Sequence, residues 1–144
     1  MTGISYSAHI SNKKSAITTK AKLAGVAKHN LRKYHSIDYS SENINLVYGT
    51  ANLMQDVKYV YEKEFSEALK QYNGKQTRED RKIDDYFEHV SENGQDMAVE
   101  IIIQCGDKEF WEENIKDKIF MKRVYPFLLN KLQQYLPDFK IANA

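Results

Sequence analysis

A histidine set among positive charges is the group in this chain best placed to do chemistry. His29 follows Lys28 and is itself followed by Arg32 and Lys33. An imidazole can act as a nucleophile near neutral pH. Neighbouring cations can hold a phosphodiester and stabilise the charge that develops during its cleavage. Spacing alone leaves an ordinary surface histidine as an equal alternative.

The charge around His29 belongs to a larger segregation along the chain. The first 37 residues carry seven Lys or Arg and no Asp or Glu. The remainder carries 14 cations and all 20 acids, so the formal net charge of +1 is the sum of a segment with a charge of +7 and a remainder with a charge of −6. Segregation of this kind indicates a face for a polyanion such as nucleic acid, and a merely solvated basic face is the alternative.

A helix from Lys20 to about His35 is expected to hold these side chains. Its apolar residues recur at helical spacing, at Leu23, Ala27, Leu31 and Tyr34. The opposite face then carries Lys22, Gly25, His29, Arg32 and Lys33. Gly25 leaves a notch one turn before His29, which would let a phosphate approach closely.

The other patterns predict a single α+β domain over residues 1–144, in which helices pack on one antiparallel sheet. We expect a first strand over 4–11, a polar loop over 12–19, and a loop with one short strand over 36–55. A helix should begin at Asp56 and end at residues 73–74, and another should end at 93–94. Residues 97–105 read as a central buried strand. The next helix should be capped by Asp107, interrupted at Pro126 and stopped by Pro137, and a final strand should open at 139–144.

Composition narrows the class of protein. The single cysteine, Cys105, excludes an internal disulfide and fits a reducing compartment. No signal-peptide core or membrane-length apolar run is present, so we expect a cytoplasmic protein without membrane contact. The four histidines have no metal-binding spacing, and no phosphate-loop, GxSxG or GxGxxG motif occurs.

Residues 24–32, which contain His29-Asn30-Leu31-Arg32, resemble the HNxR first motif of the MobV (Mob/Pre) plasmid mobilisation and recombination relaxases. Residues 43–45 and 50–53 are similar to the Asn-rich second block of that family, although the His-Leu-Asn-Tyr form is replaced by Thr-Ala-Asn-Leu. Segments 96–99, 106–111 and 136–142 are also similar to family sequence. The resemblance covers essentially the whole chain.

The resemblance implies a relaxase (HUH-like) fold and a DNA strand transferase. In this family a His or Tyr attacks a phosphodiester of single-stranded or hairpin origin-of-transfer DNA and forms a covalent protein–DNA intermediate. Carried over, His29 would be the nucleophile and Arg32 would position the phosphate, while Tyr34 is the alternative nucleophile. The residues expected to bind DNA are Lys20, Lys22, Gly25, Lys28, Asn30, Lys33, Asn45 and Asn52.

The expectation of DNA cleavage depends on the metal-binding motif of the family. Its members hold a divalent metal, Mg²⁺ or Mn²⁺, through three histidines of an HxDExxPHxH-like motif, and this sequence contains no such motif. We therefore expect the DNA-binding N-terminal part of a relaxase, incomplete at its C-terminus, that binds no cofactor and does not nick DNA alone. The alternatives are a non-catalytic DNA-binding remnant and a protein-interaction module that uses the acidic half.

Overall fold

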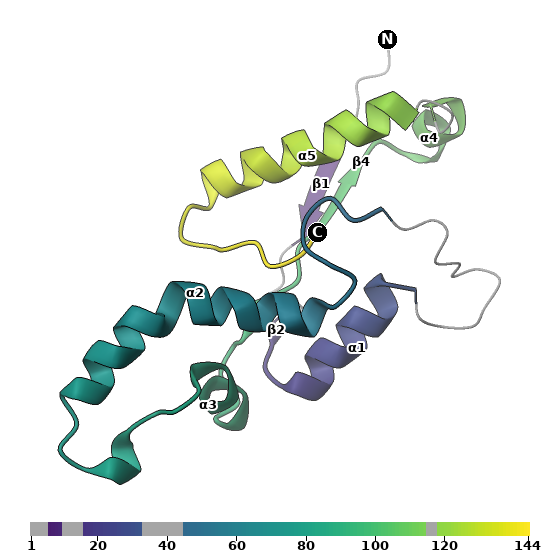
Figure 1. The fold of residues 1–144 in the computed structure, drawn as a ribbon. Coiled ribbons are helices and arrows are strands. Elements are labelled where there is room, and N and C mark those ends of the chain that lie inside the picture. The colour runs from purple at the N-terminus through teal and green to yellow at the C-terminus, as the bar shows by residue number, and fades with distance from the viewer. Residues whose placement is uncertain (1–5, 10–15, 33–44, 115–117) are drawn as a thin grey trace. The chain divides into compact units, whose positions relative to one another are not determined.

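The computed structural model describes residues 6–9, 16–32, 45–114 and 118–144, and its fold is α+β (Figure 1). The strands are β1 (Tyr6–His9), β2 (Ala16–Ile17), β3 (Ala98–Val99) and β4 (Ile102–Cys105). The helices are α1 (Lys20–Asn30), α2 (Leu53–Gly74), the 3-10 turn η3 (Glu79–Arg81), α3 (Tyr86–Glu92), α4 (Lys108–Asn114) and α5 (Lys118–Tyr135). Within the described ranges, no helix combines the length and the apolar character needed to cross a bilayer.

The chain forms two compact units. The first comprises residues 1–16 and 99–139, and its described part contains β1, β4, α4 and α5. The second comprises residues 17–98 and 140–144 and contains α1, α2 and α3. The candidate site predicted around His29 therefore lies wholly in the second unit.

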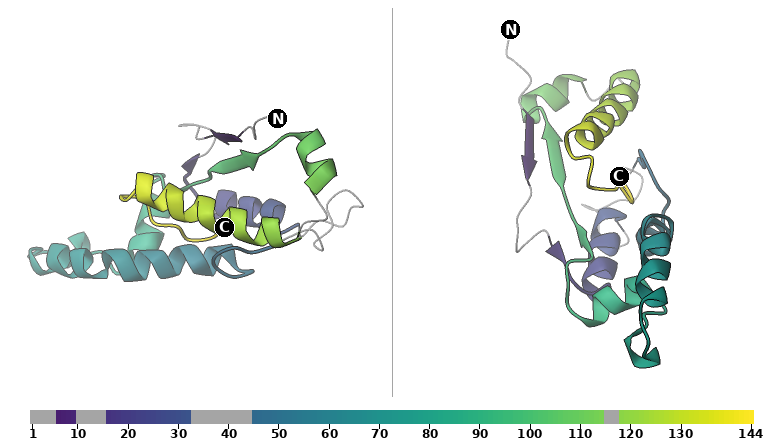
Figure 2. Two further views of the ribbon diagram at one scale, coloured as in Figure 1. Left: turned by 90° about the horizontal axis from the view of Figure 1, so that it is seen from above. Right: turned by 90° about the vertical axis from the view of Figure 1, so that its left-hand side faces the viewer.

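The second unit is organised around a small apolar core. Helix α1 lies alongside α2 in every view (Figures 1 and 2), and α3 packs on α2. The buried core residues come from all three helices and their connections, and are Ile17, Leu23, Val57, Phe87, Val90 and Met97. The Tyr61 hydroxyl donates to the Met97 carbonyl at 2.8 Å, and burial together with the nearby Tyr86 raises the pKa of Tyr61 to about 12.

The first unit contains an antiparallel pair of strands. Strands β1 and β4 lie side by side in the right-hand view of Figure 2. Their register runs from Tyr6 opposite Cys105 to His9 opposite Ile102. Strands β2 and β3 form a second two-stranded sheet. The expected strand near the N-terminus is thus confirmed over residues 6–9.

The central buried strand predicted over residues 97–105 is wrong. The apolar run is interrupted at Glu100 and divides into β3 and β4, and in the described part of the chain each belongs to a two-stranded sheet. Ile102 is 59% exposed. A run of β-branched residues favours a strand, but it does not indicate how many neighbouring strands or helices will cover that strand.

Several predicted boundaries also differ. Residues 16–17 form β2 and not loop, while 12–15 lie outside the described residues. Helix α5 continues through Pro126, although proline has no backbone N–H to donate to the Lys122 carbonyl. Pro126 is exposed, so water can donate a hydrogen bond to that carbonyl instead. Residues 139–144 form no regular strand. Instead, Val47 and Tyr48 donate their backbone N–H groups to the Ala144 carbonyl oxygen at 2.8 and 3.0 Å, and the Ala144 N–H donates back to Tyr48.

Candidate nucleic-acid interface

Helix α1 places His29 on an exposed face. Leu23 is fully buried and Val26 packs against the same core, which turns the opposite side of the helix to solvent. Lys22, Gly25 and His29 are all exposed and recur three and four residues apart, so they follow one face of the helix. Thr19 caps this helix by accepting a hydrogen bond from the Lys22 N–H at 3.1 Å.

The helix ends earlier than the sequence pattern predicts, and this changes the surroundings of His29. Leu31 is the C-cap, and the helix stops at Asn30, so Arg32 does not continue the exposed helical face. Lys33 and the predicted helical residues beyond it lie outside the described residues. His29 thus sits in the last turn, where backbone carbonyl groups carry partial negative charge.

This location gives the cations of the last turn a structural reason to be there. Positive side chains near a helix C-terminus are stabilised by the helix dipole, which applies to Lys28. A phosphate would meet the same carbonyl groups unfavourably, because anions prefer helix N-termini. Any phosphate held beside His29 must therefore be held by the side chains of Lys22, Lys28 and Arg32 rather than by the helix itself.

A glycine within α1 and an arginine directly after its C-cap occupy positions that oppose local stability. Gly25 lies in the middle of the helix, and a Cβ added there would meet no heavy atom within 4 Å. Arg32 has φ of +50°, a left-handed conformation in which glycine is the usual residue after a helix end. The stability of the helix alone would favour alanine at position 25 and glycine at position 32. A role of Gly25 and Arg32 in function would explain why these residues are present instead.

Replacing these two residues by the ones that stability favours should stabilise the chain. We expect Gly25→Ala and Arg32→Gly each to raise the free energy of unfolding by about 1 kcal/mol. Urea denaturation followed by circular dichroism measures both. If DNA approaches the notch at Gly25 and is held by Arg32, both stabilised variants will bind DNA more weakly than the parent chain. A stabilised variant with unchanged DNA affinity would remove that residue from the interface.

Lys20 is engaged within the protein. Its ammonium group forms an ion pair and hydrogen bond with Glu88 of α3, and Lys58 of α2 lies 3.6 Å from the other oxygen of the same carboxylate. The hydrogen bond with Glu88 raises the pKa of Lys20, against the opposing effect of burial, and the charges of Glu88, Glu92 and Asp85 add to the rise. Lys20 therefore links α1 to α3, and it would have to leave Glu88 to contact DNA.

The two asparagines of the second block have different environments. Asn45 is exposed in the loop before α2. Asn52 is the N-cap of α2, because its side-chain oxygen accepts the Gln55 N–H at 3.2 Å, while its own N–H donates to the Thr50 hydroxyl at 3.1 Å. The cap was predicted at Asp56, and Asn52 replaces it. Asn30 is exposed as the last residue of α1.

A hydrogen-bonded cluster near the start of α2 was not predicted. The Asp56 carboxylate accepts the Thr50 N–H and hydroxyl, both at 2.8 Å, and the Asn143 side-chain amide at 2.7 Å. Asn143 also donates to the Thr50 carbonyl at 2.8 Å. Gly49 has φ of +85° here, and a Cβ would lie 2.8 Å from both Asn143 Nδ2 and Asp56 Oδ2. Only glycine fits this turn.

The cluster borders a surface hollow of about 250 Å³, which is lined by Tyr48, Gly49, Thr50, Asp56, Tyr59, Val60 and Ala142. Burial alone would raise the pKa of Asp56, but the hydrogen bonds from Thr50 and Asn143 outweigh it and lower the pKa below its usual value. The turn and cap residues Thr50 and Asn52 carry a local signal. Asn143 carries none, because it is 87 residues away from Asp56.

The family resemblance implies a divalent metal ion. Among the described residues, no three His, Cys, Asp or Glu side chains gather as ligands of a metal ion. This part of the chain therefore does not offer a ligand set that fits such a metal.

No protein-family model, curated protein or solved structure matches this chain.

Proposed function

We propose that this chain is the N-terminal part of a DNA-nicking relaxase of the MobV kind, and that the exposed face of α1 binds DNA. His29 is the proposed nucleophile and Arg32 the group that positions the phosphate. Lys22, Lys28 and Gly25 form the rest of the proposed interface. The observation that carries the proposal is that His29 is exposed on an acid-free helix together with the exposed Lys22 and Lys28.

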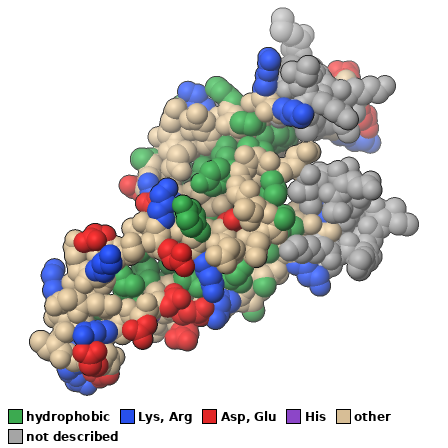
Figure 3. All heavy atoms as spheres, in the orientation of Figure 1, with side chains coloured by type: hydrophobic (Ala, Val, Ile, Leu, Met, Phe, Trp, Pro, Cys, Tyr) green, Lys and Arg blue, Asp and Glu red, His purple; other side chains and the backbone are tan. Residues whose placement is uncertain are grey.

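Charge supports DNA as the partner. Helix α1 contains three lysines and no acid, whereas acidic and basic side chains are interspersed over α2 and α3 (Figure 3). A cation-rich surface gains affinity for nucleic acid by releasing the counterions of the phosphates. The glycine in the middle of α1 and the arginine at its end are explained if a phosphate must approach closely there and be held.

The relaxase fold is part of the same proposal. In a relaxase the antiparallel β1–β4 pair would form part of a larger sheet, which could grow on the edge of β4 that has no partner strand among the described residues. The exposure of Ile102 supports this, because an added strand or helix would cover it.

A second candidate, DNA binding without nicking, is favoured by one observation. His29 lies at the carbonyl end of α1, where the helix dipole opposes the charge that builds up on a phosphate under attack. Phosphate contacts by lysine and arginine side chains do not need that position to be favourable. Binding is therefore the part of the proposal that the geometry supports more strongly than nucleophilic attack.

The experiment separates these candidates. The full chain is incubated with Mn²⁺ and a pool of single-stranded and hairpin oligonucleotides, and covalent protein–DNA adducts are sought on denaturing gels. In parallel, binding is measured by fluorescence anisotropy over a range of salt concentrations. The variants are His29→Ala and Lys28→Gln. Lys63→Gln, which changes an exposed lysine of the mixed-charge helix α2, is the matched control.

Each outcome decides between the readings. An adduct that disappears in His29→Ala supports nicking. Salt-sensitive binding without an adduct, weakened by Lys28→Gln but not by Lys63→Gln, supports the DNA-binding candidate. Binding that Lys28→Gln and Lys63→Gln weaken equally would remove α1 as the interface. No binding at any salt concentration would overturn both candidates and leave a protein-interaction module.

A further inference from the structure

Helix α5 carries a second set of basic residues, which lies outside the basic segment formed by the first 37 residues. Its 18 residues contain four cations, Lys118, Lys122, Arg123 and Lys131, and no Asp or Glu. A solvated helix face normally alternates charges of both signs, as α2 does. Because α5 belongs to the other compact unit, its charge is independent of the site proposed around His29.

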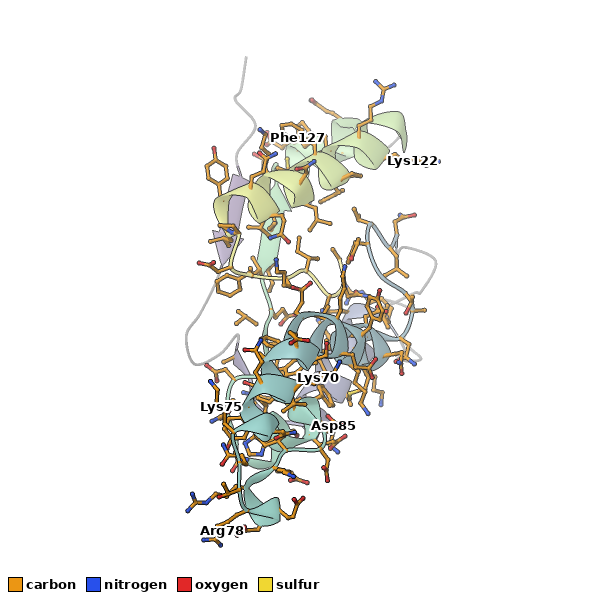
Figure 4. All side chains as sticks on the ribbon, turned by 60° about the vertical axis from the view of Figure 1, so that its left-hand side comes forward. Lys70, Lys75, Arg78, Asp85, Lys122 and Phe127 are labelled. Atoms are coloured by element: carbon orange, nitrogen blue, oxygen red, sulfur yellow. The ribbon has the colours of Figure 1, made fainter. Side chains whose placement is uncertain are left out.

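Aromatic rings alternate with the cations along one side of this helix. Arg123, Phe127, Lys131 and Tyr135 follow one another at intervals of four residues, so each lies about one turn beyond the last. Phe127 is 60% exposed and Tyr135 is 81% exposed, and both cations are exposed. Figure 4 shows Lys122 and Phe127 along the same helix.

The ring and the charge are close enough to act on one ligand. The Lys131 ammonium group lies over the Phe127 ring, 5.7 Å from its centroid, and also donates to the Gln134 side chain at 3.3 Å. A ligand that places a flat aromatic group against Phe127 therefore meets this cation at the same ring. The helical rise puts Phe127 and Tyr135 about 12 Å apart along the axis, which makes two separate stacking positions.

We propose that this face of α5 binds single-stranded nucleic acid. Bases stack on Phe127 and Tyr135, and the phosphates between them contact Arg123 and Lys131. Cationic side chains with interleaved exposed aromatic rings suit this ligand, since every base offers a flat face and every linkage a negative charge. A duplex does not suit it, because its bases are already stacked on one another.

The test uses the full chain and a fluorescein-labelled oligodeoxythymidine, with binding followed by anisotropy. The double variant Phe127→Ala/Tyr135→Ala should weaken binding about tenfold or more, without changing its salt dependence. The double variant Arg123→Gln/Lys131→Gln should reduce the slope of log affinity against log salt by about 0.7 for each cation removed. Phe127→Trp should retain the affinity, because a larger ring still stacks.

Two controls on α2 match these changes. Tyr72→Ala removes a tyrosine that is 44% exposed on a helix of mixed charge, and Lys63→Gln removes an exposed lysine of the same helix. Neither should change binding. Circular dichroism verifies that each variant keeps its helices, which is expected because the altered side chains are exposed.

Three results would overturn the proposal. One is an oligonucleotide affinity that the α5 variants leave unchanged. Another is a duplex bound as tightly as the single strand and unaffected by loss of the two rings. The third is binding to phosphatidylserine vesicles without binding to the oligonucleotide, which would make α5 a membrane-surface helix. Loss of binding in the α5 variants with full binding in Lys28→Gln would support α5 and remove the interface proposed on α1.

Discussion

Replacing Leu23 with alanine is expected to lower the free energy of unfolding by about 3 kcal/mol. Leu23 is fully buried, at 0% exposure, and packs in the core that Val57 of α2 and Phe87 of α3 share. It is the only fully buried residue that α1 contributes among those described. Its loss leaves a cavity that the neighbouring side chains refill only in part, and it loosens the helix that carries His29.

Leu46→Ala is the matched control, because the same side chain is 42% exposed there and its removal should cost less than about 0.5 kcal/mol. Unfolding in urea is followed by circular dichroism, which reports all helices, and by fluorescence of the single tryptophan, Trp111, which belongs to the other unit. A shift in the first signal without the second means that the units unfold independently. Equal losses in the two variants would contradict the position of the core.

Local signals predicted three of the helix boundaries. The end of α2 at residues 73–74 and the end of α3 at Asn93 are confirmed. Gly94, directly after α3, has φ of +63°, the left-handed conformation in which glycine commonly ends a helix, whereas α2 ends without a left-handed residue. The Asp107 cap is confirmed as well, because its carboxylate accepts the Phe110 N–H at 2.9 Å. These features depend on residues within one turn of each other, which a sequence displays directly.

Features that depend on distant partners could not be predicted in this way. The pattern placed the start of α2 at Asp56, but that carboxylate is occupied by Thr50 and Asn143, and Asn52 takes the cap. The run 97–105 is apolar enough for a buried strand, yet burial depends on which strands are available to cover it. Pairing partners come from remote parts of the chain, and composition does not identify them.

The candidate site shows the same division. The exposure of His29 beside Lys22 and Gly25 follows from helical spacing and was predicted. The end of α1 was not, because the apolar spacing continues through Leu31 and Tyr34 although the backbone turns at Arg32. The face of α5 was missed for a different reason. The chain beyond residue 37 has a negative net charge, and its acids all lie outside α5, so that net charge does not reveal an acid-free helix of 18 residues.

Asp56→Ala is expected to lower the free energy of unfolding by about 2 kcal/mol. Three donors lose their acceptor at once, namely the Thr50 N–H and hydroxyl and the Asn143 amide. Hydrogen bonds to a charged group contribute more than neutral ones, and Asp56 also lies in the first turn of α2, where negative charge is favourable. The measurement is urea denaturation near pH 7.

The pH dependence of Asp56→Ala gives an independent check. Since folding lowers the pKa of Asp56, its stabilising contribution is present above the pKa of the unfolded chain and is lost as the pH falls through the lower, folded value. The parent chain should therefore lose stability in acid more steeply than Asp56→Ala. Glu64→Ala is the control, because Glu64 meets Lys140 at 4.0 Å in an exposed ion pair whose loss costs less than about 1 kcal/mol. If Glu64→Ala were as destabilising as Asp56→Ala, the ion pair and not the hydrogen-bonded cluster would hold residues 140–144 in place beside α2.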